Sequence, residues 1–139
     1  MAAHAFGIAW VLFAVTFAIH FTDEALHGFL AEYNSRVRMI GNKLPLLPVP
    51  TFSFATWLAL LIAGFVFLLC LSPLAFHGSG WLRIVARPIA VVVGVFNAGL
   101  HLVGSIWYHR RMPGLYSSPL LLIALDLLTV DIVTLGRPD

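Results

Sequence analysis

The chain has 139 residues, of which 60% are hydrophobic and 10% charged, and its mean hydropathy is +0.96. In an average soluble domain about a quarter of the residues are charged, so this composition excludes such a domain and indicates an integral membrane protein. The formal net charge is +2, but the basic residues stand singly or in pairs at the ends of apolar segments. That distribution serves membrane topology, and no nucleic-acid partner is expected.

Four apolar segments are long enough to cross a bilayer, which takes about 20 helical residues. Short links rich in glycine, proline or charge separate most of them. We therefore predict an all-α fold, a polytopic membrane four-helix bundle that forms one domain over residues 1–139. The predicted spans are residues 5–31, 54–76, 81–108 and 115–135.

The segment between the first two spans, residues 32–51, is predicted to be a loop. Proline lacks the N–H group that a helix needs, and it restrains the residue before it. We expect the proline-rich part to lie at the membrane surface or across the mouth of the bundle. Glu32 and Arg36, four residues apart, are expected to form an ion pair. The prolines of this segment are Pro45, Pro48 and Pro50.

The basic residues divide unevenly between the two ends of the predicted bundle. Because cytoplasmic loops carry the excess of lysine and arginine, we expect the N-terminus to lie outside. We further expect a multi-pass protein of a bacterial-type cytoplasmic membrane. The cytoplasmic group would be Arg36, Arg38, Lys43, Arg110 and Arg111, against Arg83, Arg87 and Arg137 on the other side.

Ionisable side chains cluster near the end of the first predicted span: His20, Asp23, Glu24 and His27. At about 100° per residue, all four leave one face of a helix within an arc of about 100°. Ionisable groups inside a bilayer cost several kcal/mol unless they pair, bind a metal or face water. The cluster therefore predicts a buried functional site. The alternative is an interfacial cluster that lies in water just beyond a short first span.

The third and fourth spans carry polar residues at a similar predicted depth. Asn97 and His101 are four residues apart in the third span, and Asp126 lies about eleven residues into the fourth. We expect them to join the first cluster in one polar chamber, in the half of the bilayer nearest the basic side. Asp131 is expected to face elsewhere. Asn97 and His101 are equally explained as hydrogen-bonding residues that hold helices together.

A divalent metal is the favoured occupant of this chamber. The candidate ligands are His20, Glu24, His27, His101 and Asp126, whose oxygen and nitrogen atoms suit iron, manganese or zinc. Glu24 and His27 have the E-x-x-H spacing of di-iron and di-manganese bundles. The second such pair and two further glutamates are absent from the sequence, so a mononuclear site, or no metal, remains open.

Acid–base chemistry without a metal is the alternative use of the same chamber. The candidate catalytic residues are His20, Asp23, Glu24, Asn97 and His101. Asp23 would orient a histidine, and Asn97 would hold the substrate or an oxygen of an intermediate.

Three functions fit these residues. One is a membrane enzyme that acts on a small lipophilic substrate drawn from the lipid bilayer. The others are a small carrier or proton or metal-ion pathway that also uses Asp126 and Asp131, and a non-catalytic membrane module. A pathway needs polar groups on both sides of the midplane, whereas an enzyme needs one chamber. Most of the strongly polar groups lie in one half, which favours the enzyme, with Asp131 as the exception.

The chain resembles the HXXEE family of small integral membrane proteins, whose motif here reads His20-Phe21-Thr22-Asp23-Glu24. Two later features fit the same family, Asn97 with His101 and the turn Met112-Pro113-Gly114-Leu115-Tyr116. Asp23 departs from the motif by replacing the first glutamate, which keeps the charge but shortens the side chain by one methylene. The resemblance strengthens the site and implies no particular reaction.

Overall fold

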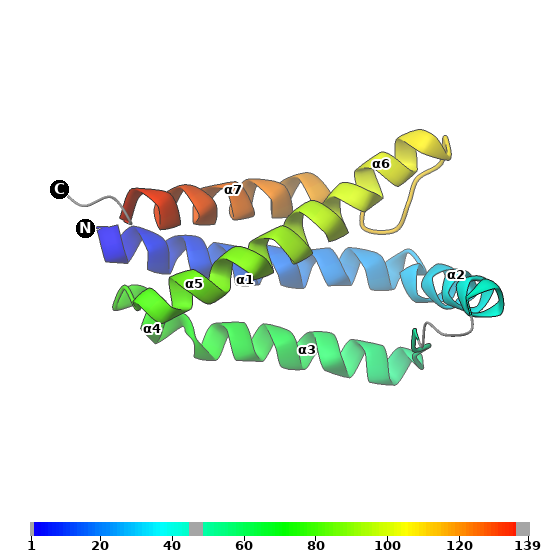
Figure 1. The fold of residues 1–139 in the computed structure, drawn as a ribbon, viewed down its shortest axis with the longest axis horizontal. Helices are drawn as coiled ribbons and strands as arrows, with labels where there is room; N and C mark the ends of the chain where they lie inside the picture. Colours follow the sequence, from blue (N-terminus) through cyan, green and yellow to red (C-terminus); the bar gives the residue numbers. More distant parts are fainter. Residues whose placement is uncertain (1, 45–48, 136–139) are drawn as a thin grey trace.

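The computed structural model describes residues 2–44 and 49–135, apart from the side chains of residues 2 and 131–135. The described chain is a bundle of helices, as predicted (Figure 1). In chain order these are α1 (Ala2–Leu26), α2 (Phe29–Lys43), α3 (Phe54–Cys70), α4 (Ser72–Phe76), α5 (Gly80–Ile89), the π-helix η1 (Ala90–Ala98), α6 (Gly99–Trp107) and α7 (Ser118–Leu135).

Three helical segments are long and apolar enough to cross a membrane: Ala3–Leu26, Phe54–Phe76 and Gly80–Trp107. A fourth apolar helix, α7, is shorter over the part whose side chains are described, Ser118–Val130. These segments match the four predicted spans in order, although the last helix begins at residue 118 because residues 113–117 form a turn. Length and composition therefore identify a membrane protein.

Helix α1 is the central element of the bundle and packs against α7, α4, α3 and α2. Its first half buries Phe6, Trp10 and Phe13 completely in the apolar core. The indole Nε1 of Trp10 donates a hydrogen bond to the carbonyl of Leu68 in α3, at 2.8 Å. The burial of this face, while Ile8, Leu12 and Val15 on another face stay exposed, fixes the rotation of α1 and the direction of the polar residues in its last turns.

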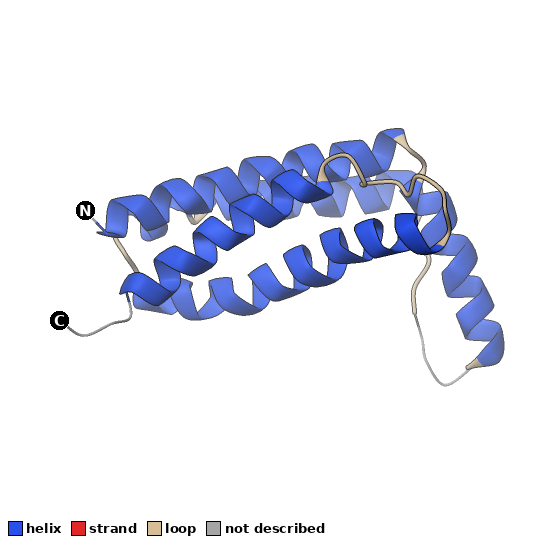
Figure 2. Ribbon diagram, turned by 90° about the horizontal axis from the view of Figure 1, so that it is seen from above, coloured by secondary structure: helices blue, strands red, loops and turns tan. Residues whose placement is uncertain are grey.

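The loop predicted for residues 32–51 is largely wrong, because α2 occupies its first half. Helix α1 stops at Leu26, earlier than predicted, because Gly28 takes a left-handed conformation (φ 76°) that glycine adopts without strain. The chain then turns, and α2 leaves the end of the bundle at an angle (Figure 2). Charged residues spaced for a helix, such as Glu32 and Arg36, support α2.

The prolines lie only at the end of the segment 32–51, so they do not prevent its first half from forming α2. Pro50 follows α2 in an extended stretch, whereas Pro45 and Pro48 lie outside the described residues. Tyr33 and Asn34 of α2 form hydrogen bonds with that stretch. The Tyr33 hydroxyl donates to the carbonyl of Pro50 at 3.1 Å, and the Asn34 amide donates to that of Phe52 at 2.8 Å.

The third span changes helical geometry in its middle. Pro88 lies inside α5 and has no N–H to donate, and the π-helix η1 begins two residues later. Wide π turns of this kind are frequent at functional sites, and this one ends just after Asn97. Gly94 allows η1 to press against α7, since a Cβ there would lie 2.0 Å from Cδ1 of Leu125.

Candidate functional site

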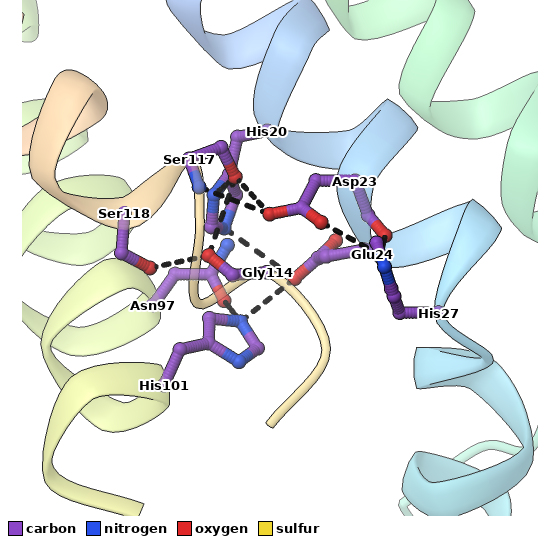
Figure 3. Close-up of polar contacts among 9 residues, drawn as sticks. All are labelled: His20, Asp23, Glu24, His27, Asn97, His101, Gly114, Ser117 and Ser118. Atoms are coloured by element: carbon purple, nitrogen blue, oxygen red, sulfur yellow. Dashed lines mark hydrogen bonds and ion pairs between the residues drawn. The ribbon is translucent and has the colours of Figure 1, made fainter. Parts of the chain in front are cut away.

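Three buried side chains meet near the C-terminal end of α1 (Figure 3). His20 and Glu24 come from α1, and His101 comes from α6; their exposed fractions are 0%, 3% and 4%. One ligand atom from each lies within 4.8 Å of the other two. Among the described residues these three form the cluster with metal-ligand geometry. The site therefore lies at the end of the bundle from which α2 departs.

Glu24 stands between the two imidazole rings. Its Oε1 is 2.9 Å from Nε2 of His101 and 3.5 Å from Nε2 of His20. The ring centroids of the two histidines are 5.2 Å apart. A carboxylate in this position can share a cation or a proton with both rings.

The hydrogen bonds around Ser117 determine where His20 carries its proton. The Ser117 hydroxyl donates to Oδ2 of Asp23 at 2.7 Å, so toward Nδ1 of His20, 2.9 Å away, it can only accept. In the neutral ring, Nδ1 of His20 therefore carries the hydrogen and Nε2 a lone pair. That Nε2 is fully buried and has no hydrogen-bond partner. A lone pair facing a carboxylate oxygen is unfavourable unless a proton or a cation lies between them.

Asp23 stabilises the site from outside the three-residue cluster, through Ser117. Its Oδ2 accepts a second hydrogen bond from the backbone N–H of Ser117 at 3.0 Å, just before α7 begins. A carboxylate is stabilised near a helix N-terminus by the exposed N–H groups there. Its Oδ1 is 2.7 Å from Nδ1 of His27. Asp23 thus reaches His20 through Ser117 and lies outside the three-residue cluster.

Asn97 contacts the other histidine. Its Oδ1 is 3.1 Å from Nε2 of His101, the same nitrogen that faces Glu24. Both partners are acceptors, so the N–H at Nε2 of His101 is shared between them. For His101 to bind a metal through Nε2, this proton must leave or the ring must shift its proton to Nδ1.

The backbone of Gly114 forms one wall of the site. It has φ +82°, and a Cβ there would lie 3.0 Å from Cε1 of His20 and 3.1 Å from Nε2 of His101. Its carbonyl accepts a hydrogen bond from the Ser118 hydroxyl at 2.7 Å. A side chain here would strain the backbone and press on both rings, so the site favours glycine.

Ser117 and Gly114 line the site, although neither was predicted as a site residue from the sequence. The Pro-Gly turn and a Ser-Ser-Pro start to the last helix are visible in the sequence, and serine and early proline are typical of helix N-termini. Those signals predict where α7 begins. They do not show that the turn folds back onto α1, which only tertiary packing decides.

Two predicted metal ligands lie outside the cluster. His27 is exposed just beyond the end of α1, and its ring contacts Asp23. The structure therefore does not bring His27 to Glu24 as the expected ligand pair. Asp126 is exposed and lines a separate groove with Arg87 of α5. It points outward because Leu125, its neighbour, faces the core. Of Asp131, only the backbone lies within the described part of the chain.

A groove of about 740 Å³ reaches His101 from the outside. It runs between α2 and the end of the third span, and its walls are mainly apolar. Asn97 and His101 line it on one side and Phe29 on the other, with the Phe29 and His101 ring centroids 5.5 Å apart. The described structure therefore gives His101 an apolar approach route.

The fold and this cluster define a class, the small helical membrane proteins that bury ionisable side chains at one end of the bundle. Residues 10–129 match the family model described as "Protein of unknown function with HXXEE motif", and the chain belongs to this family. No curated protein and no solved structure matches it. The motif has a spatial meaning here: His20 and Glu24 face each other, and Asp23 supports His20 through Ser117.

Proposed function

We propose that this protein is a membrane enzyme that uses one divalent metal ion, held by His20, Glu24 and His101. The observation that carries the proposal is the buried, unpartnered Nε2 of His20, 3.5 Å from the carboxylate of Glu24. His101 completes a set of two imidazoles and one carboxylate. Such sets bind zinc in hydrolytic enzymes and iron in non-haem oxygenases, with at least one position left for water or substrate.

The surrounding residues suit this role. The chain from Asp23 through Ser117 to Nδ1 of His20 fixes the ring so that Nε2 points inward, as carboxylates behind metal-bound histidines do. Asn97, which lines both the site and the groove, is placed to hold an oxygen of the substrate. A bound metal would supply Lewis-acid or redox chemistry there.

A lipophilic substrate is supported by the groove, whose mainly apolar walls lead to His101. We propose a bacterial-type cytoplasmic membrane as the location, with the N-terminus outside on the distribution of basic residues. A transmembrane ion pathway is less well supported. Among the described residues, the first half of α1 buries apolar side chains such as Phe6 and Phe13, and the buried ionisable groups gather at the other end.

Elemental analysis tests the proposal directly. The protein is purified in detergent without chelators, and its iron, manganese and zinc are measured beside Glu24→Gln and His101→Ala variants of confirmed helicity. We expect about one metal ion per wild-type chain and its loss from both variants. His27→Ala is the matched control, since it removes a nearby imidazole outside the cluster, and it should retain the metal. If wild-type protein binds no metal even after titration, or if Glu24→Gln retains it, the metal site is refuted.

A further inference from the structure

The groove that reaches His101 continues into a polar recess at its outer end. The recess, of about 540 Å³, is lined by Ser35, Met39 and Arg110 together with Glu32, Arg36 and Tyr108. The last three residues also line the groove, so the two spaces adjoin. The groove and the adjoining recess together, here called the channel, have the buried His101 near one end and the exposed Arg36 and Arg110 at the other.

The two ends are separated by a similar length on both walls. In α2, Arg36 follows Phe29 by seven residues, and Phe29 is the ring next to His101. On the opposite wall Tyr108 follows His101 by seven residues. Seven helical residues rise about 10 Å. Between the ends the groove presents mainly apolar side chains, including Tyr33, Val103 and Trp107.

The recess carries a net positive charge. Arg36 and Arg110 both pair with the single carboxylate of Glu32, and their side chains remain 42% and 55% exposed. Both guanidinium groups lie over the ring of Tyr108, at 5.1 Å and 5.8 Å. The hydrogen bond to Glu32 holds the pKa of Arg36 above its usual value, so this charge persists at any working pH. Each guanidinium keeps N–H donors for an anionic group.

We propose that this channel binds a bilayer lipid with a phosphate-type anionic headgroup, which Arg36 and Arg110 hold while the adjoining hydrocarbon lies along the groove past His101. Charge complementarity favours the anionic headgroup, and the apolar walls favour an attached chain over a free phosphate. Helix α2, amphipathic and at an angle to the bundle, resembles helices that lie in the membrane interface (Figure 2). As a substrate assignment this rests on the proposed metal enzyme, although binding of the lipid does not.

Lipid binding is measured on the intact protein in detergent by native mass spectrometry. The probes are dioleoyl phosphatidic acid and dioleoyl phosphatidylcholine, which share acyl chains and differ in headgroup. Glycerol phosphate serves as the chain-free anion. We expect phosphatidic acid to bind at least about tenfold more tightly than either of the others.

Two variants locate the binding. Arg36→Gln/Arg110→Gln should lower the affinity for phosphatidic acid about tenfold, a loss of about 1.4 kcal/mol. Arg38→Gln/Arg111→Gln removes the same charge from the same end of the bundle without touching the channel, and should change the affinity less than twofold.

A third variant, Val103→Trp, fills the groove and leaves the recess charges in place. It should weaken phosphatidic acid binding without creating preference for glycerol phosphate. Equal loss in the two arginine double variants, or equal affinity for the two lipids, would overturn the proposal. Glu24→Gln separates the metal proposal from the lipid proposal, since it should abolish metal binding and leave lipid binding intact. If the wild-type protein binds metal but shows no lipid selectivity, only the channel assignment is refuted.

Discussion

Gly114 offers the sharpest test of how the turn before α7 packs against the site. In Gly114→Ala, the new Cβ would stand 3.0 Å from Cε1 of His20 and 3.1 Å from Cδ2 and Nε2 of His101. These distances are shorter than ordinary van der Waals contact, and both rings are held by hydrogen bonds, so neither can yield freely. The alanine would also have to adopt φ +82°.

Two costs follow from this geometry. A left-handed backbone costs a non-glycine residue about 1–2 kcal/mol. Overpacking a tight core by one methyl costs about 1–3 kcal/mol. We expect Gly114→Ala to lower the free energy of unfolding by about 2–5 kcal/mol. The measurement is denaturant unfolding in mixed micelles, followed by helical circular dichroism. Metal affinity should fall as well, because the two rings must move apart.

Two other glycines separate these costs. Gly28 has nearly the same backbone conformation, φ +76°, and a Cβ there meets nothing within 4 Å. Gly28→Ala should therefore show the backbone cost alone and retain full metal affinity. Gly99 lies in a helix with open space around it, so Gly99→Ala should be neutral or stabilising by up to about 1 kcal/mol. If Gly114→Ala is no less stable than Gly28→Ala and binds metal normally, the turn does not pack against the imidazoles.

Three further substitutions test separate parts of the structure. Ser117→Ala removes the acceptor that orients His20 and should weaken metal binding about 10- to 100-fold. The control Thr16→Ala, which loses a buried hydroxyl bonded within α1, should leave the metal affinity unchanged. Equal metal titration curves for the two variants would contradict the role of the serine. Gly94→Ala places a methyl 2.0 Å from a leucine methyl of α7 and should destabilise the bundle by about 1–3 kcal/mol without altering metal stoichiometry, whereas an unchanged unfolding midpoint would argue against this close helix contact. His77→Ala should be silent in both assays, because this exposed ring bonds only to a carbonyl of its own turn among the described residues.

Much of the architecture could be predicted because membrane helices depend on local composition. Apolar runs of bilayer length predict the spans, and this signal needs no knowledge of packing. Helical periodicity likewise places His20 and Glu24 on one face of α1, and a spacing of four residues brings Asn97 to His101. These relations lie within single continuous spans, where the helical turn of about four residues determines which side chains are neighbours.

It was harder to predict which face each helix turns toward the bundle. The fourth span is apolar on nearly all sides, so its pattern does not show which face meets the bundle. Asp126 was therefore expected in the chamber, whereas packing of Leu121, Leu125 and Leu128 turns it outward. The short left-handed link at Gly28 similarly redirected a segment whose proline content predicted a loop.

The sequence by itself determined the class of protein, the order of its spans and the shared helix face of His20 and Glu24, because hydrophobicity and helical period act locally. It also named His101 as a candidate ligand. Only the tertiary structure brought His101 to Glu24 and set Ser117 and Gly114 against His20. The hydrogen bonds between His101 and Glu24 and between His20 and Ser117 join residues 77 and 97 positions apart. They depend on which helix faces press together, and that choice is made by the whole core at once.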